Sequence, residues 1–182
     1  KTTNLCTQHQ SISSFIVFKE ITWYIWERKH LGFRLITVLQ LVDSGSVKVK
    51  NKIVGKINRG FVILLGISKL DKKTDADYLV EKIINLRVFN DHDKKMNLSI
   101  KEVKGSVLII SQFTLCADTK KGRRPSFINA AEPKMAKNLY HYFIEKIHLK
   151  KIPVETGEFG AEMKVDLVNN GPMTLVLDSN QV

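Results

Sequence analysis

Residues 61–67 form an apolar run, Phe-Val-Ile-Leu-Leu-Gly-Ile, with no polar interruption. A strand with one face in water alternates apolar and polar residues, so an unbroken run of this kind is typical of a strand covered on both faces. Residues 35–42 predict a second buried strand. The chain has 182 residues, of which 43% are hydrophobic, and this is enough to enclose such strands in one core. We therefore expect one main domain.

Shorter patterns predict further strands. Residues 47–57 predict a hairpin, because valines and isoleucines recur on both sides of a turn near Asn51-Lys52. Additional strands are expected at 152–154, 162–168 and 173–177.

Two helices are expected between these strands. The first starts near a pair that resembles a capping box, Thr74 and Asp77. Its apolar face contains Leu79, Ile83 and Leu86. The second starts at Asn129 or Ala130. Its apolar residues at helical spacing are Met135, Leu139, Tyr142, Phe143 and Ile147.

The fold class follows from the balance of these elements. Strands outnumber helices, and many neighbouring strands could pair as antiparallel hairpins. We therefore expect an α+β fold with two main helices and a curved, largely antiparallel, barrel-like sheet.

Residues 1–33 differ from the remainder of the chain. They contain Cys6 and both tryptophans, Trp23 and Trp26, and they show no clear period. They also lack the apolar stretch and small-residue cleavage site of a signal peptide. We treat 1–33 as an N-terminal extension of uncertain status and 34–182 as the folded domain; a leader peptide, a translation artefact and a real extension all stay open.

The charge is strongly positive, with 29 Lys and Arg against 18 Asp and Glu and a formal net charge of +11. Such a charge favours a polyanionic partner, because each phosphate contact releases counterions. The alternative explanation of this charge is a set of lysine-rich surfaces that contact only solvent.

Cys6 and Cys116 form no paired framework, which suits a reducing compartment. We expect a cytoplasmic protein with no membrane partner, while organellar targeting by residues 1–33 stays open.

Ser111-Gln112-Phe113-Thr114 directly follows the apolar residues 107–110, so two hydroxyls and a carboxamide stand where a strand ends. No His or Lys is placed to activate Ser111 or Thr114, and a lone hydroxyl is a poor nucleophile. Two interpretations stay open. The hydroxyls could satisfy the local backbone, or they could orient a substrate while backbone N–H groups form an oxyanion hole.

Gly171-Pro172 lies between strand-like residues 163–168 and 174–177. Gly-Pro is a common turn, and it can also take a cis bond. The functional alternative is a rigid turn that presents carbonyl oxygens to a bound amine and excludes one stereoisomer by clash.

Other polar groups favour ordinary structural roles. His141 and His148 could share a helix face but lack a nearby acidic or cysteine cluster. Residues 90–93 resemble the start of a calcium loop without its later Gly and Glu, which predicts a turn with Asx hydrogen bonds. Cys116 has no base partner, so a small buried residue is expected. The sequence has no Walker loop, Gly-x-Ser-x-Gly or His-Glu-x-x-His motif, and we expect no metal and no cofactor.

Several ordered motifs resemble those of the D-aminoacyl-tRNA deacylase family, and the similarity runs from about residue 35 to residue 177. The motifs are Ser111-Gln112-Phe113-Thr114-Leu115, Ala117-Asp118-Thr119, Gly122-Arg123-Arg124-Pro125-Ser126-Phe127, Thr156-Gly157-Glu158-Phe159-Gly160-Ala161-Glu162-Met163 and Asn170-Gly171-Pro172-Met173-Thr174. Residues 34–182 are accordingly similar to a deacylase domain of this family.

The resemblance implies a homodimer with active sites at the subunit interface. The implied hydrolase reaction cleaves the ester that joins a D-amino acid, or glycine, to the terminal ribose of tRNA, which is chiral proofreading in translation. Gly171 and Pro172 would form a cis pair inserted from the partner subunit, with carbonyls that engage the α-amino group and exclude L side chains. The substrate would be RNA and not DNA, because the reaction would depend on the 2′-hydroxyl.

The resemblance also assigns residues. The segment that lines the adenosine and the scissile ester would be Ser111, Gln112, Phe113 and Thr114. The 2′-hydroxyl would activate water, while the backbone amides of Phe113 and Thr114 steady the oxyanion. The rest of the pocket would be lined by Ala131, Phe159 and Met163. The tRNA phosphates would be met by Lys120, Lys121, Arg123 and Arg124.

One departure from the family pattern affects stereochemistry. The family's first strand usually carries Gln-Arg-Val, and its Arg helps to hold the Gly-Pro turn, whereas this chain has Gln40-Leu41-Val42. Leu41 cannot make that polar contact, so another residue substitutes or stringency is relaxed. The alternative hypothesis is a non-catalytic or relaxed-specificity tRNA-binding homologue.

Overall fold

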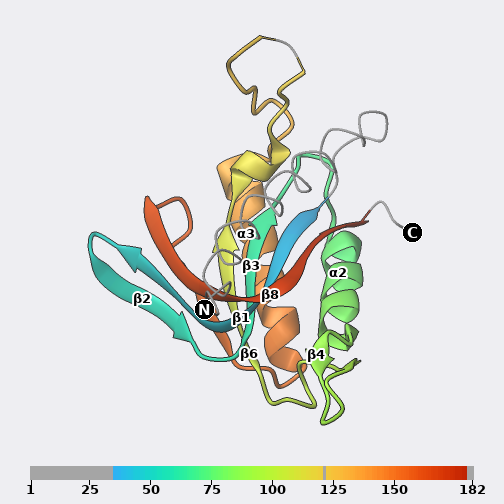
Figure 1. Ribbon diagram of the computed structural model, residues 1–182. Helices are drawn as coiled ribbons and strands as arrows, with labels where there is room; N and C mark the ends of the chain where they lie inside the picture. Colours follow the sequence, from blue (N-terminus) through green and yellow to red (C-terminus); the bar gives the residue numbers. More distant parts are fainter. Residues whose placement is uncertain (1–34, 121, 180–182) are drawn as a thin grey trace, which may run out of the picture. The chain divides into compact units, whose positions relative to one another are not determined.

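The computed structural model describes residues 35–120 and 122–179 (Figure 1). The strands of the main sheet are β1 (Ile36–Val49), β2 (Lys52–Ile57), β3 (Gly60–Gly66), β6 (Ser106–Ser111), β7 (Val154–Thr156) and β8 (Met163–Asp178). The helices are α2 (Lys73–Asn85), the 3-10 helix η1 (Phe113–Cys116) and α3 (Pro133–Leu149). A small second sheet pairs β4 (Phe89–Asn90) with β5 (Met96–Leu98). The expected extension, residues 1–33, lies outside the described residues.

The main sheet has six strands in the order β2-β1-β3-β6-β7, with β8 paired to β1. Strand β1 is antiparallel to β2, β3 and β8. The pairs β3–β6 and β6–β7 are parallel, because α2 lies in the connection from β3 to β6 and α3 in the connection from β6 to β7. The α+β class and the curved, largely antiparallel sheet are confirmed, with the parallel strands confined to one side.

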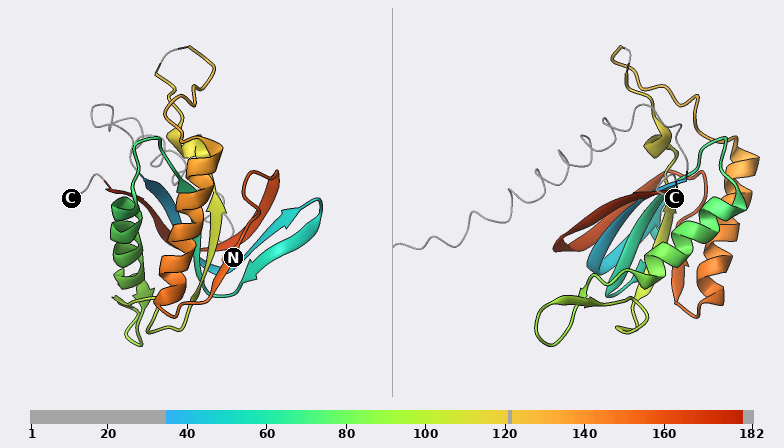
Figure 2. Two further views of the ribbon diagram at one scale, coloured as in Figure 1. Left: turned by 180° about the vertical axis from the view of Figure 1, so that it is seen from behind. Right: turned by 90° about the vertical axis from the view of Figure 1, so that its right-hand side faces the viewer.

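Both helices cover the same face of the sheet (Figure 2). The core between them contains Phe61, Ile63 and Leu65 of β3, together with Leu79 of α2 and Phe143 of α3. A second cluster on the other face of the sheet contains six further buried strand residues. Its members are Val42, Val47, Ile57, Val62, Leu108 and Ile110. The unbroken apolar run at 61–67 is thus explained, because its alternate side chains enter two different clusters.

Two strand predictions were too short. Strand β1 continues from Ile36 to Val49 and ends at a tight turn of Lys50 and Asn51, whose φ angles are 48° and 63°. The turn therefore lies one residue earlier than the predicted Asn51-Lys52. Two consecutive residues with left-handed backbone are typical of a two-residue hairpin turn, because their twist matches that of the flanking strands. Residues 162–168 and 173–177, predicted as separate strands, belong to the single strand β8.

Both helix starts differ from the prediction. In α2 the capping carboxylate is Asp75, whose Oδ2 accepts from the Lys72 N–H at 2.8 Å. Asp77 instead accepts from the Tyr142 hydroxyl at 3.0 Å. Helix α3 starts at Pro133 and not at Asn129 or Ala130. Residues 129–131 are held against residues 67–69 by main-chain hydrogen bonds, and proline suits the first helical position.

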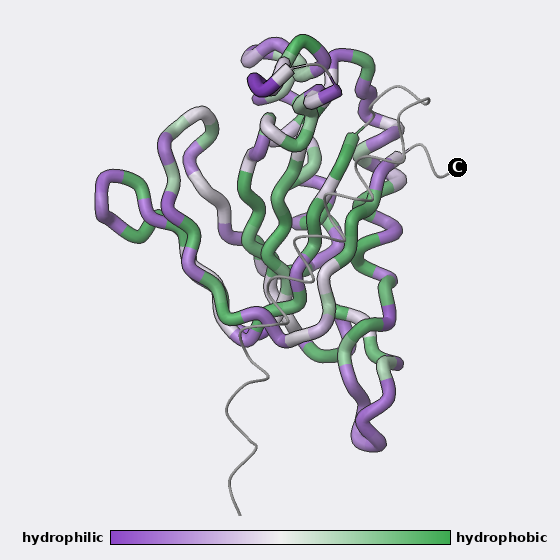
Figure 3. Tube along the Cα trace, turned by 45° about the horizontal axis from the view of Figure 1, so that its top comes forward, coloured by the Kyte–Doolittle hydropathy of each residue, from purple (hydrophilic) through white to green (hydrophobic). Residues whose placement is uncertain are grey.

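Apolar residues concentrate in the strands and the inward sides of the helices, while the loops are mostly polar (Figure 3). Within residues 35–120 and 122–179, neither helix has the length and hydropathy needed to span a bilayer.

Candidate functional site

A pocket of about 500 Å³ opens where β3 and β6 end beside the start of α3. Its lining residues are Leu65, Ile67, Ile110, Ser111, Gln112, Phe113, Ala130, Ala131, Pro133, Ala136, Phe159, Gly160, Ala161, Met163 and Val165. The structure therefore brings together six residues that the sequence assigned to one site: Ser111, Gln112, Phe113, Ala131, Phe159 and Met163. Thr114 follows directly in η1.

The polar wall of this pocket is built by the turn from β6 into η1. The Gln112 N–H donates to the Leu65 carbonyl at 2.8 Å, which anchors the turn on β3. Gly66 allows the chain around Gln112 and Leu115 to approach β3 closely. A Cβ at this position would lie 2.8 Å from Leu115 Cβ and 3.2 Å from the Gln112 carbonyl oxygen. The backbone of η1 is thus fixed at the pocket edge by main-chain contacts.

Two main-chain donors at the start of η1 are available for a ligand. The first N–H groups of a helix have no intrahelical acceptor, and no hydrogen bond between described residues uses the N–H of Phe113 or Thr114. The Gln112 side-chain amide donates to Thr114 Oγ1. The hydroxyl of Thr114 is therefore oriented by an amide and not by a base.

No side chain that titrates near neutral pH lines the part of the pocket that the structure describes. The nearby thiol of Cys116 is fully buried, and burial raises its pKa to about 12. The expectation that Cys116 is a small buried residue is confirmed, because a thiol with this pKa stays protonated. The pocket can bind and polarise a small group, but its described lining residues provide no general base.

The opposite wall is supported by Tyr140 of α3. Its ring lies 5.6 Å from the ring of Phe159, and its hydroxyl donates to the Ile109 carbonyl at 2.8 Å. Burial raises the pKa of Tyr140 to about 12, so the phenol stays neutral and serves as a fixed support. The Ala131 N–H donates to the Ile67 carbonyl at 3.0 Å, which fixes the third side of the pocket.

Gly171 and Pro172 lie outside this pocket, in an exposed bulge of β8. Their peptide bond is cis. The pairing with β1 jumps from Thr174 opposite Gln40 to Asn169 opposite Val42, so residues 170–173 loop out opposite a single β1 residue. The Gly-Pro turn is therefore exposed and is not part of the lining of its own pocket.

The β1 residue opposite this bulge is Leu41, which is 8% exposed and belongs to the core beneath the helices. Next to it, Asn169 Oδ1 and Thr174 Oγ1 are buried and have no hydrogen-bond partner among the described residues. A tether exists on the outer side, where Asn170 Nδ2 donates to Asp43 Oδ1 at 2.8 Å. Sequence reasoning missed Asp43, because only the bulge brings it to Asn170.

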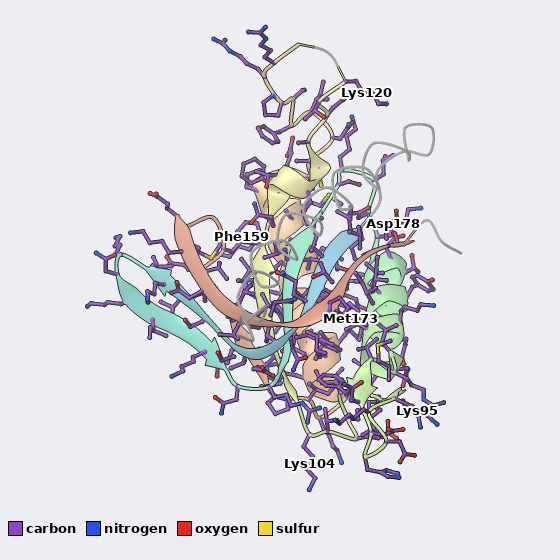
Figure 4. The ribbon with its side chains drawn as sticks, in the orientation of Figure 1. Lys95, Lys104, Lys120, Phe159, Met173 and Asp178 are labelled. Atoms are coloured by element: carbon purple, nitrogen blue, oxygen red, sulfur yellow. The ribbon has the colours of Figure 1, made fainter. Side chains whose placement is uncertain are left out.

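The loop between η1 and α3 carries the predicted phosphate-binding residues and projects from the domain (Figure 1). Main-chain hydrogen bonds between Asp118 and Ser126, at 2.7 and 2.8 Å, close its base. Lys120, Arg123 and Arg124 are exposed on the loop. Lys121 lies outside the described residues. Lys120 lies at the end of the domain opposite Lys95 and Lys104 (Figure 4).

The remaining polar motifs have structural explanations. Asp91 Oδ1 accepts from the N–H groups of Asp93 and Lys95 at 2.9 and 3.0 Å, which confirms the predicted Asx turn. His141 packs its ring against Tyr140. No group of metal-ligating side chains was found in the part of the chain that the structure describes.

Fold and pocket together define a small α+β protein whose site presents main-chain donors in place of ionisable side chains. The family model described as D-Tyr-tRNA(Tyr) deacylase matches residues 38–178. The chain belongs to this family, which confirms the resemblance seen in the sequence.

Individual relatives agree with this assignment. A D-aminoacyl-tRNA deacylase of Thermosipho melanesiensis is 56% identical over 146 residues, which cover 80% of this chain and 97% of that protein. One from Clostridioides difficile is 49% identical over 144 residues, with 79% and 97% covered. The solved structure of a c-Myc DNA Unwinding Element Binding Protein is similar with a TM-score of 0.74 and 35% identity, covering 79% of this chain and 97% of that one.

Proposed function

We propose that this chain hydrolyses the ester bond between a D-amino acid and the 3′-terminal ribose of tRNA. It is a hydrolase by family, and its relatives are named D-aminoacyl-tRNA deacylases. The observation that carries the proposal is the pocket itself. Its lining offers the Ser111 hydroxyl and the Gln112 carboxamide beside the free N–H groups of Phe113 and Thr114, and no described side chain in it serves as a base. Such a pocket can stabilise charge on an ester oxygen without taking up a proton.

The proton acceptor is then supplied by the substrate. The 2′-hydroxyl of the terminal ribose lies beside the ester in every 3′-aminoacyl-tRNA and can activate the attacking water. Water adds to the carbonyl carbon and passes a proton to the 2′-oxygen, while the N–H groups of Phe113 and Thr114 stabilise the oxyanion. The bond to the 3′-oxygen then breaks, the 2′-hydroxyl gives its own proton to the 3′-oxygen, and the free D-amino acid leaves.

Stereochemical selection is proposed to require a homodimer, in which Gly171-Pro172 of one protomer enters the pocket of the other. The turn is exposed and lies outside its own pocket. Among the described strands, β8 pairs only with β1, and it exposes 37% of Val165 and 57% of Val168. An unpaired edge with exposed apolar residues favours contact with a second chain.

The turn would select by shape. Its carbonyl oxygens would accept hydrogen bonds from the substrate ammonium and leave no space for an L side chain. Glycine carries two hydrogens on its α-carbon and has no side chain that would clash with the turn, so glycyl-tRNA is proposed as a second substrate. Lys120, Arg123 and Arg124 are proposed to contact tRNA phosphates, as the sequence also predicts for Lys121.

Purified protein incubated with D-tyrosyl-tRNA, L-tyrosyl-tRNA and glycyl-tRNA tests the proposal by release of the amino acid. We expect release from the D and glycyl esters and retention of the L ester. A D-tyrosyl ester on tRNA with a terminal 2′-deoxyribose should resist hydrolysis. Unchanged turnover on that substrate would remove the 2′-hydroxyl from the mechanism.

The alternative function, favoured by Leu41 opposite the bulge, is a tRNA-binding homologue with relaxed or lost selectivity. It predicts tRNA binding with equal release from D and L esters, or with no release. Because one relative is named for binding DNA, single-stranded DNA should be included as a competitor. We expect it to compete less well than RNA of the same sequence.

A further inference from the structure

Three large apolar side chains are exposed beside the pocket, where solvent contact is unfavourable. Phe113 is 58% exposed, Phe127 is 37% exposed and Ile128 is 74% exposed. The rings of Phe113 and Phe127 meet edge to face, with centroids 5.0 Å apart and planes at 65°. An exposed apolar patch of this kind marks an interaction surface.

The main chain holds this patch in place. Ser126, directly before Phe127, exchanges two hydrogen bonds with Asp118 across the base of the loop. The Phe127 carbonyl accepts from the Ala130 N–H at 3.0 Å. The aromatic pair is therefore part of the fixed base of the loop and not of its tip, which reduces the entropy lost when a ligand orders it.

The surroundings identify the chemistry of the partner. On one side Phe113 itself lines the pocket that would hold the terminal adenosine ester. On the other side the same loop continues to exposed Arg123 and Arg124. An aromatic surface between a pocket and a cationic tip suits unpaired nucleotides, whose bases stack on aromatic rings while their phosphates meet cations.

We propose that Phe127, braced by Phe113 and flanked by Ile128, stacks a base of the unpaired tRNA 3′ end, just ahead of the terminal adenosine. This inference rests on the proposed function, because it places the terminal adenosine in the neighbouring pocket. In this proposal the Phe127 ring binds any base that precedes the terminal adenosine, without selecting its identity, because every base has a π-face.

The test compares D-tyrosyl esters of adenosine alone and of the trinucleotide cytidylyl-cytidylyl-adenosine. For wild type, KM should be lower for the trinucleotide ester. For Phe127→Ala, the ratio of the trinucleotide KM to the adenosine KM should rise about tenfold, which is the typical size of one lost base–aromatic stack. Phe127→Trp should restore the ratio, because the larger ring also stacks. Leu149→Ala removes another exposed apolar side chain, at the far end of α3, and serves as the matched control.

Several outcomes would overturn the inference. An unchanged ratio in Phe127→Ala would show that the ring contacts no preceding base. A parallel rise of both KM values would show that the ring shapes only the adenosine pocket. Loss of the dimer in light scattering, with activity falling on both esters, would assign the patch to a second copy of the chain. Wild-type protein inactive on both esters would instead refute the proposed function itself.

Discussion

At the scale of single residues, Gly171 is a position where a substitution is expected to affect function and not folding. A Cβ at this position would meet only Asn169 Nδ2, at 3.7 Å, which is ordinary van der Waals distance. We expect Gly171→Ala to unfold at the wild-type temperature and to lose D-tyrosyl-tRNA hydrolysis, because the added methyl group lies on the surface proposed to face the substrate. Thermal unfolding and single-turnover hydrolysis measure the two effects.

Thr114→Ala is the matched comparison for this variant. Its hydroxyl is oriented by Gln112, and no base contacts it among the described residues, so its loss should slow turnover by about tenfold or less. An inactive Thr114→Ala enzyme beside an active Gly171→Ala enzyme would contradict the main-chain mechanism.

Asp71 should give the protein an unusual dependence of stability on pH. The carboxyl is 4% exposed, and burial raises its pKa from 3.8 to about 6, although it accepts from the Ser68 N–H at 2.7 Å. Between pH 3.8 and 6 the folded chain keeps a proton that the unfolded chain has lost. The free energy of unfolding contributed by Asp71 therefore falls as pH rises through this window, by on the order of 3 kcal/mol.

Urea unfolding of wild type and Asp71→Asn at pH 4 and pH 7 checks this prediction. Other carboxyl groups titrate in both proteins. The change in the free energy of unfolding between pH 4 and pH 7 is therefore compared between wild type and variant, and the difference is the contribution of Asp71. The wild type should lose more stability than the variant on going to pH 7. Equal changes in the two proteins would refute the assignment.

At the scale of elements, the bulge of β8 depends on contacts with β1. Leu41 contributes only apolar packing, and the side chain of Asn170 in the bulge is tied to Asp43 of β1 by a hydrogen bond. We expect Asp43→Ala to reduce the preference for D-tyrosyl-tRNA over L-tyrosyl-tRNA by about two- to fivefold, the size expected for one exposed hydrogen bond. Competitive hydrolysis of the two esters measures the preference.

Asp43→Asn provides the control, because its side-chain oxygen can still accept from Asn170 while the charge is removed. A loss of preference in Asp43→Asn equal to that in Asp43→Ala would assign the effect to charge and not to the tether. An unchanged preference in both variants would show that the bulge holds its shape without this link.

The elements also show what the sequence could predict. Strand β3 and the positions of Leu79 and Ile83 on the apolar face of α2 follow from local patterns of residues, and the structure confirms them. Leu86, which was predicted on the same face, lies one residue after the end of the helix. The start of α3 could not be predicted, because residues 129–131 are taken by pairing with residues 67–69, which are distant in sequence. The continuity of β8 across the Gly-Pro bulge was missed for the same reason, since its register is set by β1.

The site was predictable to a similar degree. The family resemblance identified six lining residues, and five of them lie in its conspicuous motifs, whereas Ala131 lies outside these motifs. The apolar remainder, such as Ile67 and Ala136, carries no signal of its own and joins the pocket only through the packing of α3 on β3. Phe127 stands in a quoted motif, but its role depends on exposure, which the sequence does not reveal.

At the scale of the whole molecule, the described domain carries lysines at opposite ends, with Lys120 at one end and Lys95 and Lys104 at the other (Figure 4). We expect the double variant Arg123→Ala/Arg124→Ala to weaken tRNA binding and to lower the slope of log K against log salt by about 1 to 2, because each phosphate contact releases counterions. Filter binding across a salt series measures the slope.

Lys95→Ala/Lys104→Ala removes the same charge from the other end and is the matched control. Its slope should stay close to that of wild type. Equal losses of slope in the two double variants would mean that tRNA responds to total charge and not to the loop after η1.

The lack of ionisable groups in the described pocket lining also determines how such an enzyme can be inhibited. Reagents that acylate serine or alkylate cysteine need an activated nucleophile, and the nearest thiol, Cys116, is buried and protonated. The proposed mechanism forms no acyl-enzyme that could be trapped midway. The proposed mechanism therefore predicts that turnover is blocked by a molecule that fills the cavity reversibly, with an uncleavable bond in place of the ester.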